Sequence, residues 1–212
     1  MKYTKFDKSK NYDLNIIFVF EDNMSAIGRA IDRGPAFDDI KISINNKVMT
    51  GKTGSRNIFT SKLYDRSYYV VGLGKKSELT TQIFEKCLNT ALKEINRYKM
   101  STISIDLTNI KIKNFNLLRG SIVEIEKAQY AYKKSSSSSL KQCALKLSST
   151  FETKRFNQII LESSAISNGI NKARMLGDTP SNICNPTFLA KEAKKLEKIN
   201  KNIKVEILDE KQ

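Results

Sequence analysis

The chain has 212 residues, a formal charge of +15 from 37 lysines and arginines against 22 aspartates and glutamates, and no histidine. The lack of histidine excludes histidine-based triads and histidine-ligated zinc, so any chemistry would rest on carboxylates, lysine or cysteine. Three widely spaced cysteines argue against a disulfide framework and favour a reducing cytoplasm. The longest apolar run, residues 16–20, is far shorter than the ~20 residues of a membrane-spanning helix.

The first part of the chain predicts strands, with one short helix. Residues 13–20 are rich in β-branched and aromatic side chains, which is typical of a strand. The elements expected after it are a short helix over 25–31 stopped by Gly34-Pro35, a hairpin arm over 41–50, a turn over 51–55 and a returning strand over 56–62.

The middle of the chain predicts a strand–helix–strand unit. Residues 68–71 and 102–107 read as strands. Between them, apolar residues recur at steps of three and four, which indicates an amphipathic helix with Thr80 or Thr81 as its N-cap. The residues of that apolar face are Phe84, Leu88, Ala91, Ile95 and Tyr98. Such a unit implies parallel strands and a right-handed crossover.

The last part predicts a long helix that leads into a second α/β unit. Before it come a helix over 115–131, a surface loop of five serines over 135–139 and a strand over 142–147. The long helix covers 153–176, and Gly177 and Pro180 are expected to end it. Asn185 and Pro186 then start another helix, and alternation over 203–207 predicts a strand.

Two glycine-containing turns invite a comparison with phosphate-binding loops. Gly72-Leu-Gly74 follows a strand, but it lacks the third glycine of a dinucleotide fingerprint. Gly51-Lys-Thr-Gly54 has Asn46, not glycine, five residues upstream, so it does not match a P-loop. We interpret the first as a strand-to-helix turn and the second as a hairpin turn.

The remaining candidates for chemistry are two carboxylate pairs and a cysteine. Asp38-Asp39 and Asp209-Glu210 are adjacent in sequence, whereas a metal site needs ligands that converge from different elements. Cys184 has no histidine to lower its thiol pKa, and we expect it to be a small buried residue. No catalytic, cofactor-binding or metal-binding residue is therefore predicted.

An ordered set of segments resembles the leucyl aminopeptidase family, also called cytosol aminopeptidase or peptidase M17. Residues 173–190 resemble the family's Ala-Arg, Thr-Pro, Asn and Pro-x-x-Leu-Ala pattern at the opening of its peptidase domain. The segments that resemble the family upstream of this pattern are 17–22, 69–75, 101–107, Gly120 and 130–135.

The resemblance implies an α/β fold: a macro-like mixed sheet flanked by helices, a long linking helix and an incomplete second α/β unit. The expected divisions are a macro-like domain over 1–150, the linking helix over 151–178 and the start of a truncated peptidase domain over 179–212. The family peptidase uses two divalent metals, Mn or Zn, and assembles as a hexamer with the N-terminal domains outside. The family's motifs resembling Lys-Gly-x-x-x-Asp and Asp-Ala-Glu-Gly-Arg-Leu do not occur here, so no metal is expected in this chain.

The leading hypothesis is the N-terminal, non-catalytic portion of such a metallo-exopeptidase, in the cytoplasm, inactive alone and acting through self-association or a catalytic peptidase domain. One alternative is a macro-like module that binds ADP-ribose, with Gly72 to Gly74 near a phosphate. The other is a nucleic-acid binder, which the positive charge favours. The lysines are scattered without an arginine-rich patch, so specific nucleic-acid binding is not the preferred interpretation.

Overall fold

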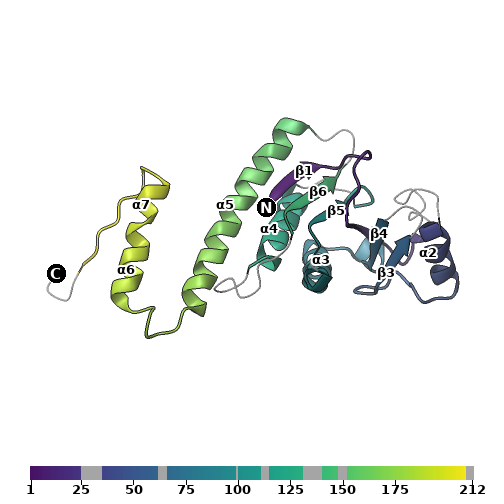
Figure 1. Ribbon diagram of the computed structural model, residues 1–212, viewed down its shortest axis with the longest axis horizontal. Helices are drawn as coiled ribbons and strands as arrows, with labels where there is room; N and C mark the ends of the chain where they lie inside the picture. The colour runs from purple at the N-terminus through teal and green to yellow at the C-terminus, as the bar shows by residue number, and fades with distance from the viewer. Residues whose placement is uncertain are drawn as a thin grey trace. The chain divides into compact units, whose positions relative to one another are not determined.

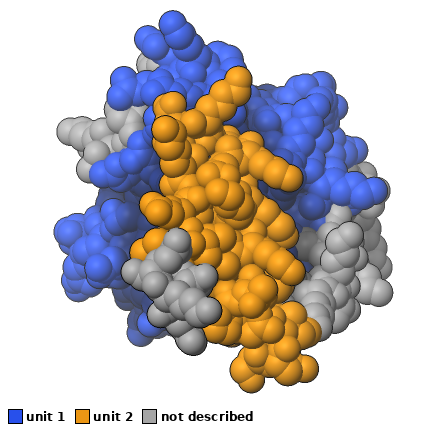
Figure 2. Space-filling model, turned by 90° about the vertical axis from the view of Figure 1, so that its left-hand side faces the viewer, with its two compact units in different colours: residues 1–168 blue, residues 169–212 orange. Residues whose placement is uncertain are grey.

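The computed structural model describes residues 1–24, 35–61, 66–98, 100–110, 115–130, 140–147 and 152–208. The chain divides into two compact units, residues 1–168 and residues 169–212, which Figure 2 colours blue and orange. The first unit contains the sheet and most of the helices. The second contains the end of the long helix and the short helices that follow it.

The first unit is built on a six-stranded sheet in the order β1-β6-β5-β2-β4-β3 (Figure 1). Adjacent strands are parallel except β3, which runs antiparallel to β4 at one edge. The strands are β1 (Lys2–Lys5), β2 (Leu14–Val19), β3 (Arg56–Ser61), β4 (Arg66–Gly72), β5 (Thr102–Asp106) and β6 (Gln142–Lys146). This mixed sheet with flanking helices confirms the predicted α/β fold class.

Among the helices in the described residues, those of the first unit cover both faces of the sheet. The described helices are α2 (Pro35–Asn45), α3 (Thr81–Ile95), α4 (Phe115–Ala128), α5 (Thr153–Asp178), α6 (Pro186–Lys194) and α7 (Leu196–Ile199). Short 3-10 turns lie at Lys76–Glu78 and Asn96–Tyr98. Among these helices, none combines the length and apolar character that crossing a lipid bilayer requires.

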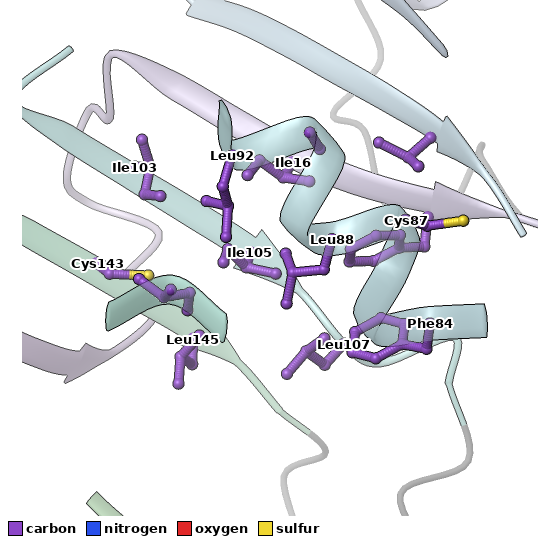
Figure 3. Packing of buried hydrophobic residues seen from close by; sticks show 14 of the residues in the cluster. Ile16, Phe84, Cys87, Leu88, Leu92, Ile103, Ile105, Leu107, Cys143 and Leu145 are labelled. Atoms are coloured by element: carbon purple, nitrogen blue, oxygen red, sulfur yellow. The ribbon is translucent and has the colours of Figure 1, made fainter. Parts of the chain in front are cut away.

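The core has two parts, one on each face of the sheet. Leu14, Ile16 and Phe18 of β2 belong to the larger cluster, together with buried residues of α3, α4 and the first turns of α5. Figure 3 shows Leu88 and Leu92 of α3 lying over the side chains of strands β2 and β5. The smaller cluster joins β2, β3 and β4 to α2 on the other face, through Ile17, Val19, Ile40, Met49, Phe59, Tyr68 and Val70.

The middle unit of the sequence folds as predicted, with two differences. The Thr80 hydroxyl accepts a hydrogen bond from the Ile83 N–H at 3.2 Å and caps α3. Strands β4 and β5 are both parallel to β2, which lies between them, so the pair is not adjacent. Tyr98 is 56% exposed because α3 ends at Ile95, so it is not part of the apolar face.

The prediction of a hairpin arm over 41–50 is wrong, because residues 35–45 form α2. The alternation of Ile40, Ile42 and Ile44 imitates a strand. In the helix, Ile40 and Ser43 are buried while Ile42 is 56% exposed, which is helical spacing. Pro35 occupies the first helical position, where proline is favoured, so it begins a helix.

Other differences lie at the ends of the chain. The edge strand β1 was not predicted, because the lysines at both of its ends leave no alternation of apolar and polar residues to indicate a strand. The strand expected over 203–207 does not form; the Val205 N–H instead donates to the Glu197 carboxylate at 3.0 Å. The last helix is interrupted at Lys195, and α5 continues through Gly177 to Asp178. The helix expected over 25–31 and the serine loop over 135–139 lie outside the described residues.

Replacing Ile105 with alanine should destabilise the first unit by about 2–5 kcal/mol, because its fully buried side chain on β5 would leave a cavity. Urea unfolding followed by circular dichroism measures the change. Leu161→Ala is the matched control, because Leu161 is 73% exposed on α5. If Ile105→Ala lowered the free energy of unfolding no more than Leu161→Ala does, this description of the core would be contradicted.

Candidate functional site

The two glycine-containing segments singled out in the sequence lie against each other and form one structure, here named the double turn (residues 51–55 and 72–74). The Gly54 N–H donates to the Gly72 carbonyl at 3.0 Å, and the Gly74 N–H donates to the Gly51 carbonyl at 2.9 Å. A Cβ on Gly72 would lie 2.3 Å from the Lys52 carbonyl oxygen and 2.7 Å from the Gly51 carbonyl carbon. Glycine is therefore required at position 72 by the close approach of two backbones.

The amides of the double turn are already engaged in this packing. The Gly72 N–H donates to Ser55 at 2.7 Å and the Leu73 N–H donates to Val19 at 2.9 Å, both to carbonyl oxygens. With the Gly74 N–H bonded to Gly51, all three amides of Gly72 to Gly74 have protein partners. A phosphate loop needs such amides free to face the anion, so this turn offers the ADP-ribose alternative no support.

A cavity of about 280 Å³ lies beside the double turn, with Cys87 at its wall. Burial raises the pKa of the Cys87 thiol, and the side chain is only 6% exposed. A raised pKa leaves little thiolate at neutral pH, and thiolate is the reactive form. The geometry therefore favours a structural role for this cysteine.

A second, polar cavity of about 70 Å³ lies on the face of the sheet that α2 partly covers; we name it the sheet-face pocket. Its floor comes from β2 and β5, where Asn15 and Ser104 are neighbours in register. The Ser104 hydroxyl donates to the Asn15 side-chain oxygen at 2.6 Å. Further along β5, Asp106 is 5% exposed and forms an ion pair with Lys146 of β6 at 2.8 Å.

The connection between β1 and β2 forms one wall of the sheet-face pocket. The rings of Phe6 and Tyr12 stack with centroids 5.4 Å apart, and the Asp7 N–H donates to the Tyr12 hydroxyl at 3.2 Å. The Lys146 ammonium lies 5.4 Å from the centre of the Phe6 ring. These contacts hold Lys8 and Lys10, which also line the pocket, at its rim.

In the second unit, an ionic cluster that we name the junction joins the end of α5 to α6. Lys172 of α5 and Lys195 after α6 both form ion pairs with Glu192 of α6. Glu192 is only 7% exposed, and the hydrogen bond from Lys172, followed by that from Lys195, lowers the pKa of its carboxyl group. The Asn185 side chain caps α6 by accepting from the Phe188 N–H at 2.9 Å, as the sequence predicted.

The other sequence candidates do not converge on a site. Asp38 and Asp39 are exposed on α2, and Asp209-Glu210 lies outside the described residues. Cys184 is half-buried instead of fully buried, in the turn before α6. Over the described ranges, no three histidine, cysteine, aspartate or glutamate side chains come together as metal ligands.

The sheet and its helices match a known family. The family model described as "Cytosol aminopeptidase family, N-terminal domain" matches residues 16–155. The chain belongs to the cytosol aminopeptidase family. This result confirms the resemblance that the sequence segments indicated.

Curated members of the cytosol aminopeptidase family are similar to this chain over part of their length. A probable cytosol aminopeptidase of Buchnera aphidicola is 32% identical over 183 residues, which cover 78% of this chain and 36% of that protein. The cytosol aminopeptidase of Haemophilus influenzae is 30% identical over 178 residues, covering 79% of this chain and 36% of that protein. The matched region thus spans little more than a third of each relative.

Solved structures share the fold. A tomato leucine aminopeptidase mutant matches with a TM-score of 0.78 and 17% identity, over 99% of this chain and 44% of that one. The bottromycin maturation enzyme BotP in complex with Mn matches with a TM-score of 0.64 and 15% identity, over 89% of this chain and 36% of that one. At these identities the likeness shows the fold alone.

Neither the sheet-face pocket nor the junction was predicted, although both leave a trace in the sequence. Ser104 and Asp106 interrupt the apolar residues of β5 at alternate positions, which places them on one face of the strand. Asn15 does the same in β2. Glu192 lies among lysines on α6. Charged residues grouped in this way usually form the solvated face of a helix, so the burial of Glu192 was not predicted.

Gly72→Ala should destabilise the first unit by about 1–3 kcal/mol, because the new Cβ meets backbone atoms that cannot move independently. Thermal or urea unfolding measures the effect. Gly169→Ala is the control, since nothing lies within 4 Å of its Cβ position on α5. That control should be neutral or stabilising, and a Gly72→Ala protein as stable as the wild type would contradict the close approach.

The Glu192 carboxyl group should titrate below the ordinary glutamate pKa of about 4.3. A lowered pKa means that its contribution to stability is present above the unfolded-state pKa and is lost as pH falls through the folded-state pKa. A carbon-detected NMR titration reads the midpoint directly. Lys172→Gln should raise the midpoint, Lys191→Gln should leave it unchanged, and an ordinary midpoint in the wild type would contradict the junction.

Proposed function

We propose that this chain supplies the N-terminal, non-catalytic portion of a leucyl aminopeptidase-like metallo-exopeptidase, an enzyme that removes N-terminal amino acids from peptides. The observation that carries the proposal is the match of residues 16–155 to the N-terminal domain of the family. The shared fold with a tomato leucine aminopeptidase supports it. In this role the first unit, which contains the sheet, supports assembly of the protein and forms part of the surroundings of a catalytic domain.

We further propose the division of the chain that the sequence indicated. A macro-like domain over 1–150 is supported by the six-stranded sheet, whose last strand ends at Lys146. A linking helix over 151–178 is supported by α5, which covers Thr153–Asp178. The start of a peptidase domain over 179–212 is supported by the Asn185 cap and Pro186 at the start of α6.

The peptidase reaction proposed for the family uses two divalent ions, Mn or Zn, to activate water and polarise the scissile carbonyl. BotP, similar in fold, has a solved complex with Mn. The described part of this chain has no cluster of three metal-ligating side chains. It therefore does not fit a paired-metal centre, and the proposal places both ions in a peptidase domain.

The proposed partners are further copies of this chain or a catalytic peptidase domain, in a hexamer with the sheet units outside. The proposed compartment is the cytoplasm, which the name of the curated relatives supports. Cys87 and Cys143 are buried free thiols, which suits a reducing compartment.

The purified chain, with Mn²⁺ or Zn²⁺ added, should release no leucine from leucine p-nitroanilide above the rate of metal in buffer alone. The assay is absorbance of released nitroaniline, with an active leucine aminopeptidase as positive control. Hydrolysis that coelutes with the chain in gel filtration and disappears with a chelator would contradict the non-catalytic role.

A further inference from the structure

We propose that the sheet-face pocket binds a phosphate group, either as free phosphate or as the phosphate of a small phosphomonoester. The pocket lies between the floor residues Asn15 and Ser104 and the cationic residues Lys8, Lys10 and Lys146. This site is separate from the junction and from the double turn, and it requires no peptidase chemistry.

The polar floor departs from what the sheet needs for stability. On the same face, Ile17, Val19 and Val70 pack against α2 as an apolar cluster. Burying a polar side chain is unfavourable unless it is hydrogen-bonded, so apolar residues would cover β2 and β5 more simply. Asn15 and Ser104 are nevertheless present, and Ser104 is only 3% exposed.

The floor is held in place by protein partners. The Asn15 side-chain amide donates to the Ser67 carbonyl at 3.2 Å, and its oxygen accepts from the Ser104 hydroxyl at 2.6 Å. An amide NH₂ group has two donor hydrogens, so Asn15 keeps one for a ligand. The geometry is therefore fixed before any ligand enters, which reduces the entropic cost of binding.

The charge around the pocket favours an anion. Four cationic residues line it, Lys8, Lys10, Arg66 and Lys146, against one carboxylate, that of Asp106. Asp106 is already paired with Lys146.

Two other ionic groups near the pocket have partners within the protein. The Asp7 carboxylate lies close by, where it accepts from the Ser9 N–H at 3.0 Å and interacts with Lys10. The Arg66 guanidinium donates to the Asn11 side chain at 3.2 Å.

Lys146 is suited to reach a ligand from its present position. An ammonium group carries three donor hydrogens, and its ion pair with Asp106 occupies only one side of it. The Phe6 ring lies on another side of the ammonium, 5.4 Å away at its centre. The remaining donor capacity, with the ammonium groups of Lys8 and Lys10 at the rim, matches an anion with several acceptor oxygens.

The size of the pocket selects a small group. The pocket offers about 70 Å³ to the centres of water-sized groups, several times the ~10–15 Å³ that one bound water requires on the same measure. This space holds one small oxyanion but no nucleotide base or peptide. The organic part of a phosphomonoester would extend past Lys8 and Lys10 into solvent.

The test is titration calorimetry of the full chain with inorganic phosphate and with glycerol 3-phosphate, at constant ionic strength. Saturable binding to one site is expected, and it should weaken as salt is raised. Lys8→Gln combined with Lys10→Gln should raise the dissociation constant about three- to tenfold, because each exposed charge contributes modestly.

The matched control is Lys52→Gln combined with Lys93→Gln, which removes the same charge from exposed positions outside the pocket. This control should change the dissociation constant less than twofold. An equal loss in both double variants would overturn the proposal in favour of nonspecific attraction, as would the absence of saturable binding. Acetate that binds as tightly as phosphate would overturn the choice of ligand.

NMR locates the bound anion independently of affinity. Phosphate should shift the backbone amide signals of Asn15 and Ser104, while the amides of α6 remain unchanged. Shifts confined to regions away from β2 and β5 would overturn the assignment. The comparison of inorganic phosphate with glycerol 3-phosphate distinguishes the two sources, since binding of the ester shows that the pocket accepts a metabolite.

Discussion

Strand β2 is the constraint on which the rest of the first unit depends. It lies between β4 and β5 with parallel partners on both sides, and five of its six residues, all except Asn15, are at most 2% exposed. A parallel strand in this position must be covered on both faces. Helices α3, α4 and the start of α5 cover one face, while α2 and the connection after β1 cover the other. The sheet-face pocket exists because this second cover is incomplete above Asn15.

The second unit is organised differently, by polar contacts. Glu192 is the only buried residue among 169–208, and its two lysine partners are 39% and 62% exposed. Leu189, Leu196 and Ile199 are exposed. The Asn185 cap and the Lys194 ammonium, which donates to the Val205 carbonyl at 2.8 Å, contribute further local order. Ion pairs with exposed partners stabilise a fold only modestly. Residues 169–208 therefore lack the apolar core that orders the first unit.

The sequence predicted elements whose apolar pattern agrees with their burial. Helix α3 is one example, because Phe84, Leu88 and Ala91 follow the helical period and are all buried. Helix α2 was missed because three isoleucines at alternate positions imitate a strand, and only burial against β2 reveals the helix. The strand over 203–207 did not form because a strand needs a neighbour to receive its hydrogen bonds. The sheet-face pocket depends on contacts between residues up to 140 positions apart, such as Phe6 and Lys146, which no local pattern reveals.

The central proposal is that the chain supplies the non-catalytic N-terminal portion of a family member, with the metal chemistry in a peptidase domain. Native mass spectrometry of the chain equilibrated with excess Mn²⁺ tests that claim most directly. The account predicts folded chains without a stoichiometric metal ion. Two Mn²⁺ ions bound per chain, and removed together by a chelator, would contradict it.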